Sequence, residues 1–108
     1  MTELTLEERI VKLRQSIEAS GKPDYDKAIA LLRMYREFIE DARYESNAAL
    51  ASRLNEEARY VIMSNKGMLK EFFEIKTVSS LLGFYGVKSV QDIEGMAGSN
   101  RDYLLKTK

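Results

Sequence analysis

Hydrophobic residues recur every three or four positions along most of this chain, which is the spacing of one face of an α-helix. The first such series is Leu6, Ile10, Val11, Leu13 and Ile17. Thr5 and Glu8 have the spacing of a capping box, in which each side chain bonds to the other residue's backbone amide. Gly21 suits a left-handed terminating residue, and Pro23 cannot continue a helix. The pattern therefore predicts a first helix over about 5–20.

A second series follows the only proline with a regular four-three spacing: Ala28, Leu32, Tyr35, Ile39 and Ala42. Asp24 is placed to serve as its N-cap. The pattern changes phase at Ser46 and Asn47 and continues as Leu50, Leu54, Ala58 and Val61. Either one helix of about forty residues carries a stutter, or two helices meet here. So long a helix would be exceptional in a small domain, which favours helices over 24–44 and 47–65.

A break at Gly67 precedes the most aromatic part of the chain. One stripe consists of Met68, Phe72, Ile75, Val78 and Leu82, and it is broadened by Leu69, Phe73 and Leu81. This predicts a fourth helix over about 67–83, closed by Gly83 or Gly86. Ser89 and Asp92 then indicate a short capped turn. We expect residues 87–108 to form this C-terminal turn and a mobile or loosely docked tail.

Four amphipathic helices with short connections are typical of an antiparallel up-down bundle. The chain has 108 residues, of which 44% are hydrophobic and 31% charged, an ordinary globular balance. That length supports one core and not two. The predicted architecture is therefore an all-α antiparallel four-helix bundle, with residues 1–108 as a single domain.

Charge and cysteine content narrow the range of partners and locations. Lysine plus arginine and aspartate plus glutamate number 17 each, so no basic excess favours binding to nucleic acid. The chain has no cysteine, its N-terminal segment is charged throughout, and no apolar run reaches the length of a membrane span. We therefore expect a cytoplasmic protein.

The residue types needed for most enzymatic sites are missing. The chain has no histidine and no cysteine, which removes the commonest general base, the commonest nucleophile-base pairs and nearly every zinc site. The adjacent pairs Glu40–Asp41 and Glu56–Glu57 point in different directions on a helix and do not make a shared carboxylate site. We expect no catalytic residue, no cofactor, no metal and no small-molecule substrate.

Two features near the end of the fourth helix invite a binding function. Residues 77–93 allow a helix-turn-helix interpretation, but the second helix is short and offers only Lys88 and Gln91 near its start, so a bundle helix with a terminal turn is favoured. Most aromatic residues are at core spacing. Phe84 and Tyr85 lie beside glycines at a helix end, where we expect a partly exposed ring that is available to a partner.

Three segments together resemble a known family. The run PDYDKAIALLRMYREFIE from Pro23 resembles the second helix of the immunity proteins for pediocin-like (class IIa) bacteriocins. The run ALASRLNEEARYVIMSNK resembles their third helix, with Arg53 and Leu54 as its arginine-leucine pair and Asn65 and Lys66 at its end. The run LLGFYG resembles the aromatic-glycine close of their fourth helix. The likeness is to the enterocin A immunity type and covers residues 23–86.

The resemblance implies a cytosolic four-helix bundle that is not an enzyme. Such proteins act at the inner face of the membrane on the mannose-type phosphotransferase permease that the bacteriocin uses as its receptor, or on the permease with its bound bacteriocin. Peripheral membrane contact is the corresponding expectation. The oligomeric state stays open, with a monomer favoured. The family's specificity lies in the C-terminal half and tail, which here predicts partner-binding residues at Phe84, Tyr85, Lys88, Arg101, Tyr103, Lys106 and Lys108.

Two other functions stay open at this stage. One is a small helical regulator or adaptor of a phage-borne, nucleic-acid-associated kind, which the neutral charge balance does not favour. The other is a subunit that assembles with copies of itself through its aromatic stripe.

Overall fold

A computed structural model describes residues 5–96, and all regular secondary structure in this range is helical. The helices are α1 (Leu6–Glu18), α2 (Asp24–Tyr44), α3 (Ala48–Ser64), α4 (Lys66–Glu71), α5 (Lys76–Phe84) and α6 (Val90–Glu94). The predicted all-α class is confirmed.

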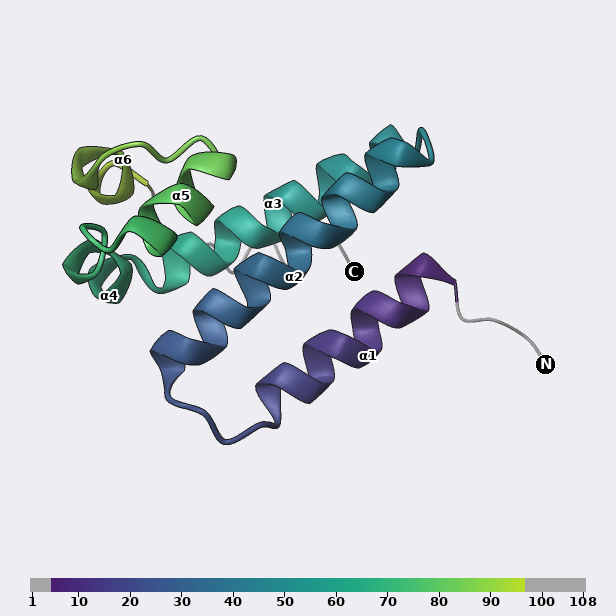
Figure 1. Cartoon of the computed structure of the whole chain (residues 1–108), viewed down its shortest axis with the longest axis horizontal. Helices are drawn as coiled ribbons and strands as arrows, with labels where there is room; N and C mark the ends of the chain where they lie inside the picture. Colours follow the sequence, from purple (N-terminus) through teal and green to yellow (C-terminus); the bar gives the residue numbers. More distant parts are fainter. Residues whose placement is uncertain (1–4, 97–108) are drawn as a thin grey trace.

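The centre of the molecule is the pair formed by α2 and α3, which lie side by side and run in opposite directions (Figure 1). α1 packs along α2 on one side of this pair. α5 packs on α2, α4 contacts the end of α3, and α6 contacts α4. The three short helices therefore gather at the end of the pair where α3 finishes, whereas α1 lies along its length (Figure 1).

Local signals placed the first three helices correctly. Thr5 and Glu8 form the predicted capping box, with nitrogen–oxygen distances of 2.9 and 3.1 Å. The division between α2 and α3 falls at Ser46, whose φ of 60° is left-handed. The Asn47 side chain then accepts a hydrogen bond from the Leu50 amide at 3.2 Å and caps α3. The two-helix interpretation is confirmed.

The predicted N-cap of α2 is wrong by one residue. Pro23 occupies the cap position with an extended backbone, and Asp24 is the first helical residue. No side chain caps this end of α2. Asp24 and Asp26 instead lie in the first turn, where their negative charge is favourable to the helix dipole.

The predicted continuous helix over 67–83 is also wrong. α3 ends at Ser64, Asn65 is its C-cap, and α4 begins at Lys66, so Gly67 lies inside a helix. The backbone leaves the helix at Phe72–Ile75 and re-enters it at Lys76, after which α5 continues through Gly83. Gly86, with φ of 85°, supplies the left-handed residue after α5. The interruption falls among aromatic and β-branched residues, whose helix propensity is low.

The interruption changes which residues of the aromatic stripe are buried. Phe72 and Ile75, which belong to the predicted apolar stripe, are 37% and 45% exposed. The residues that the pattern had placed at the edge of the stripe, Leu69, Phe73 and Leu81, are buried together with Val78 and Leu82. The break rotates α5 relative to α4, and a single helical phase could not have predicted that rotation.

The core lies mainly between α2 and α3 and extends to α5 and α6. Its most deeply buried large side chains are Leu32, Ile39, Leu54, Ile62, Leu69, Leu82, Ile93 and Val87. Ser89 and Asp92 form a second capping box, which starts α6 and places Ile93 in the core. The predicted C-terminal turn is therefore present and is anchored by burial. Residues 97–108 of the predicted tail lie outside the described residues.

Candidate functional site: the surface between α2 and α5

Tyr85, at the end of α5, is fastened to both central helices. Its hydroxyl donates a hydrogen bond of 2.5 Å to the Leu32 carbonyl of α2. Its own carbonyl accepts a bond of 2.6 Å from Nη1 of Arg59 on α3. The side chain is 3% exposed, and burial raises the pKa of its phenol. The expectation of an exposed ring at this position is therefore wrong, because Tyr85 serves as an anchor for α5.

Phe84, the residue before Tyr85, is only partly buried and packs against the core cluster. Two arginines of α2 converge on its ring. The guanidinium carbon of Arg36 lies 5.0 Å from the ring centre and that of Arg43 lies 5.7 Å away. The ring also meets Tyr85 edge-on at 5.0 Å. We call the set Arg36, Phe84 and Arg43 the arginine clasp.

A groove between the outer side of α2 and the first half of α5 adjoins this clasp. Its volume is about 560 Å³, and its lining consists of Arg33, Arg36, Glu37, Glu40, Lys76, Thr77, Ser80 and Leu81. Arg36 belongs to both features, so the clasp and the groove form one continuous surface. Charged side chains of both signs and two hydroxyls suit it to recognising a polar partner.

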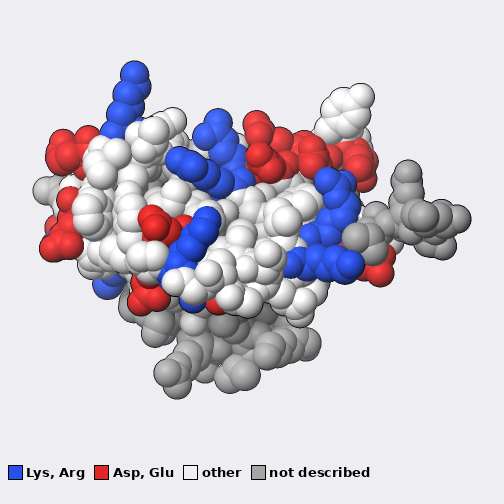
Figure 2. Space-filling model, turned by 60° about the horizontal axis from the view of Figure 1, so that its bottom comes forward, with Lys and Arg blue, Asp and Glu red and all other residues white. Residues whose placement is uncertain are grey.

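The charge on the surface of the molecule is mixed. Figure 2 shows basic and acidic residues interleaved over the face that it presents, and neither sign covers that face. A nucleic-acid backbone needs several cations in a row. The mixed pattern instead favours a partner whose individual charged groups pair with individual charged side chains of this surface.

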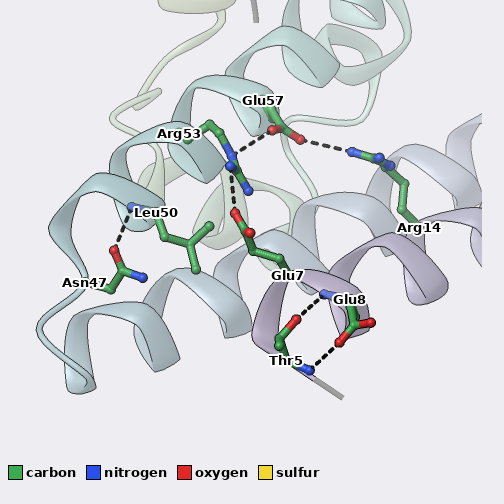
Figure 3. A network of polar contacts seen from close by, with 8 residues as sticks. All are labelled: Thr5, Glu7, Glu8, Arg14, Asn47, Leu50, Arg53 and Glu57. Carbon is green, nitrogen blue, oxygen red and sulfur yellow. Dashed lines mark hydrogen bonds and ion pairs between the residues drawn. The ribbon is translucent and has the colours of Figure 1, made fainter. Parts of the chain in front are cut away.

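A second polar site lies between α1 and α3. Glu57 accepts from Arg14 at 3.2 Å, from the Tyr35 hydroxyl at 3.1 Å and from Nε of Arg53 at 3.5 Å. Arg53 also pairs with Glu7 of α1 at 2.8 Å (Figure 3). We call these residues the α1 latch, since their contacts join α1 to α3 and α2.

The α1 latch borders a cleft of about 360 Å³. Burial raises the pKa of Tyr35 to about 12, against a partial opposing effect of Arg14. The phenol therefore stays protonated at neutral pH and acts as a hydrogen-bond donor. Glu57 is already engaged by three donors, so this network favours a structural role over ligand binding.

Residues 5–96 contain no grouping of acidic side chains that could hold a metal ion. Within the same range, no helix is long and apolar enough to cross a membrane. The α2–α5 surface and the cleft beside the α1 latch are two of the hollows in this range, and the first of them is the candidate recognition surface.

The structure distributes the predicted site residues unequally. Phe84 lies on the α2–α5 surface, and Lys88 is exposed beyond it, with its backbone amide bonded to Asp92. Tyr85 is buried. The remaining predicted residues, Arg101, Tyr103, Lys106 and Lys108, lie outside the described residues.

Sequence reasoning missed Arg36 and Arg43. The available signal was their spacing of seven residues, which places two like charges two turns apart on one side of a helix. Nothing in the sequence showed that Phe84, more than forty positions away, would lie beneath both.

Comparisons with known proteins identify no relative. No family model, no curated protein and no solved structure matches this chain.

Proposed function

We propose that this chain is an immunity protein, which protects a bacterial cell from a pediocin-like bacteriocin by binding another protein. The observation that carries the proposal is the arrangement of the three segments that resemble the family. They fall on α2, α3 and α5, and these helices pack around one core. The LLGFYG segment supplies both Tyr85, which fixes α5 to α2, and Phe84, which lies on the candidate surface.

We further propose that the helices form the antiparallel four-helix bundle expected of the family, with α4 and α5 together taking the place of the fourth helix. This assignment is supported by α2, which contacts α1, α3 and α5. The interruption at Phe72–Ile75 then becomes a variation within the fourth helix.

The proposed role is non-catalytic binding in the cytoplasm, at the inner face of the membrane. The partner is a permease of the mannose phosphotransferase type, alone or with its bound bacteriocin. The lack of histidine and cysteine in the chain favours binding over catalysis. The α2–α5 surface is the region that we assign to the partner, because it combines the predicted residue Phe84 with a groove and convergent charges.

Protection of a sensitive strain tests this role. The chain is expressed in bacteria that are killed by several pediocin-like peptides, and the inhibitory concentration of each peptide is measured. We expect protection against one or a few related peptides. Phe84→Ala should remove it, whereas Phe72→Ala, the same truncation at a ring that is 37% exposed and lies outside the clasp, should retain it. Protection against no peptide of the class would reject the proposal, provided that thermal unfolding shows a folded chain.

A second candidate is a subunit that associates with copies of itself. The observation in its favour is the apolar surface around Phe72 and Ile75, where the ring of Phe72 lies 4.5 Å from that of Tyr25. Sedimentation at micromolar concentration separates the two candidates. An immunity protein of the proposed kind is expected to sediment as a monomer, and Ile75→Glu should leave that state unchanged.

A further inference from the structure

We propose that the arginine clasp is a receptor for carboxylate groups, and that the partner of the α2–α5 surface presents an acidic segment to it. The inference names the chemistry of the partner and therefore rests on the binding role proposed above. Two cations converge on one ring, neither has an acidic partner among the described residues, and acidic side chains lie beside them in the groove.

The clasp brings together two charges that would otherwise separate. Arg36 and Arg43 are seven residues apart, or about 10 Å along the axis of α2 at 1.5 Å per residue. Both guanidinium groups nevertheless approach the same ring, at 5.0 and 5.7 Å from its centre. The negative face of an aromatic ring attracts each of them, which offsets part of the repulsion between them. Phe84 thus holds two cationic groups at one place on the surface.

Neither arginine has an acidic partner among the described residues. The ion pairs within residues 5–96 use other cations, namely Arg14, Arg53 and Lys70. A guanidinium that lies over a ring still has N–H donors in its own plane, and these match the two oxygens of a carboxylate. A carboxylate bound by these donors would neutralise part of the repulsion that the ring only partly offsets.

The neighbouring acids favour a protein carboxylate over a nucleic-acid backbone. Glu37 and Glu40 line the groove next to the clasp, together with Arg33 and Lys76. A polyanion that ran along the groove would bring successive phosphates against both glutamates. A peptide with isolated acidic residues can place a carboxylate at the clasp and leave the glutamates facing water or its own basic residues. The presence of both acidic and basic side chains in the groove therefore favours a peptide over a nucleic-acid backbone.

The chain offers a matched control at Arg9. Its guanidinium carbon lies 5.4 Å from the centre of the Phe38 ring, a geometry similar to that of either clasp arginine. There, however, the ring carries one arginine and not two. Arg9 therefore separates the effect of stacking on a ring from the effect of two convergent cations.

Nuclear magnetic resonance on the full chain tests the inference. The Nε–H signals of the arginines are followed while three probes are added separately: a blocked Ala-Glu-Ala-Glu-Ala peptide, inorganic phosphate, and a single-stranded oligonucleotide. We expect a saturable shift with the peptide at Arg36 and Arg43 and none at Arg9. The double variant Arg36→Lys/Arg43→Lys keeps the charge but loses the planar donors, and should weaken peptide binding at least about tenfold. Arg9→Lys should leave it unchanged.

The inference would be overturned by equal shifts at Arg9 and the clasp, by unchanged peptide affinity in the double lysine variant, or by tighter binding of the oligonucleotide than of the peptide. Saturable binding of phosphate alone would equally reject a carboxylate receptor. If the double variant fails to fold, Phe84→Leu, which keeps both arginines but removes the ring, should instead weaken peptide binding about threefold. Protection of cells is measured separately. If the chain protects cells but does not bind the peptide, the proposed function stands and the carboxylate receptor is rejected.

Discussion

The two sides of the central α2–α3 pair are covered in different ways. On one side, α1 buries a single side chain completely, Ile10, and is fastened by the ion pairs of the α1 latch. On the other side, α5 and α6 bury a continuous series that includes Leu82, Val87 and Ile93.

The difference extends to the polar contacts. Tyr35, beneath α1, donates to the carboxylate of Glu57, which is shared with two arginines. Tyr85, at the end of α5, donates to the Leu32 carbonyl, which is a neutral group inside α2. Exposed ion pairs contribute little and weaken with salt, whereas apolar burial does not depend on ionic screening. We therefore expect the attachment of α1 to depend on ionic strength and that of the C-terminal helices to depend on packing.

The largest effect on stability is expected from Leu82→Ala, which removes apolar packing between α5 and the central pair. The side chain is fully buried in α5, so its truncation removes apolar burial and leaves a cavity. We expect the free energy of unfolding to fall by about 2–5 kcal/mol. Urea unfolding followed by circular dichroism measures it. Leu13→Ala on α1 removes the same atoms from a side chain that is 45% exposed and should change stability by less than about 0.5 kcal/mol. A loss below about 1 kcal/mol for Leu82→Ala would contradict the comparison.

Alkaline pH is the next test, because it acts on the two buried phenols. The folded-state pKa of Tyr35 is raised to about 12, and that of Tyr85 is raised as well, in each case mainly by burial. A raised phenol pKa means that folding favours the protonated form. The stabilisation is complete below the unfolded pKa of about 10 and is lost as pH rises from about 10 to 12. For Tyr35 the loss is about 2–3 kcal/mol.

The control for the alkaline loss is phenylalanine at each position. Urea unfolding is repeated at a series of pH values up to about 12. Tyr35→Phe and Tyr85→Phe should each flatten part of the decline, and Tyr44→Phe, at a position that is 90% exposed, should leave it unchanged. An equal decline in the wild-type chain and in the Tyr35→Phe/Tyr85→Phe variant would show that the two phenols do not cause it.

The fold could be predicted wherever a signal is local. Both capping boxes and the Asn47 cap depend on residues three positions apart, and a pattern of residue types is enough to place them. The interruption at Phe72–Ile75 contains neither glycine nor proline. It arises where residues of low helix propensity meet the packing requirements of α4 and α5, so a local pattern could not place it.

The candidate site was less predictable for the same reason. The glycines beside Phe84 and Tyr85 indicated a helix end correctly, but which ring faces the core depends on α2. Tyr85 is buried because the Leu32 carbonyl and Arg59 lie within its reach. The clasp requires Arg36 and Arg43 from one helix and Phe84 from another. Contacts between distant segments decide both features.

The smallest effect on stability is expected from the ion pairs that hold α1. Arg53→Gln removes the ion pair with Glu7 and the pair with Glu57, and it should lower stability by about 0.2–1 kcal/mol. Its effect on amide hydrogen exchange should be local, with faster exchange in α1, little change in α5, and no difference from wild type at high salt.

Lys70→Gln is the matched control, since it removes an exposed pair with Glu94 between α4 and α6. α6 should stay protected in that variant, because Ile93 anchors it by burial. If loss of Lys70 released α6 as much as loss of Arg53 releases α1, the two sides would be held in the same way, and the distinction between a latched helix and a packed one would fail.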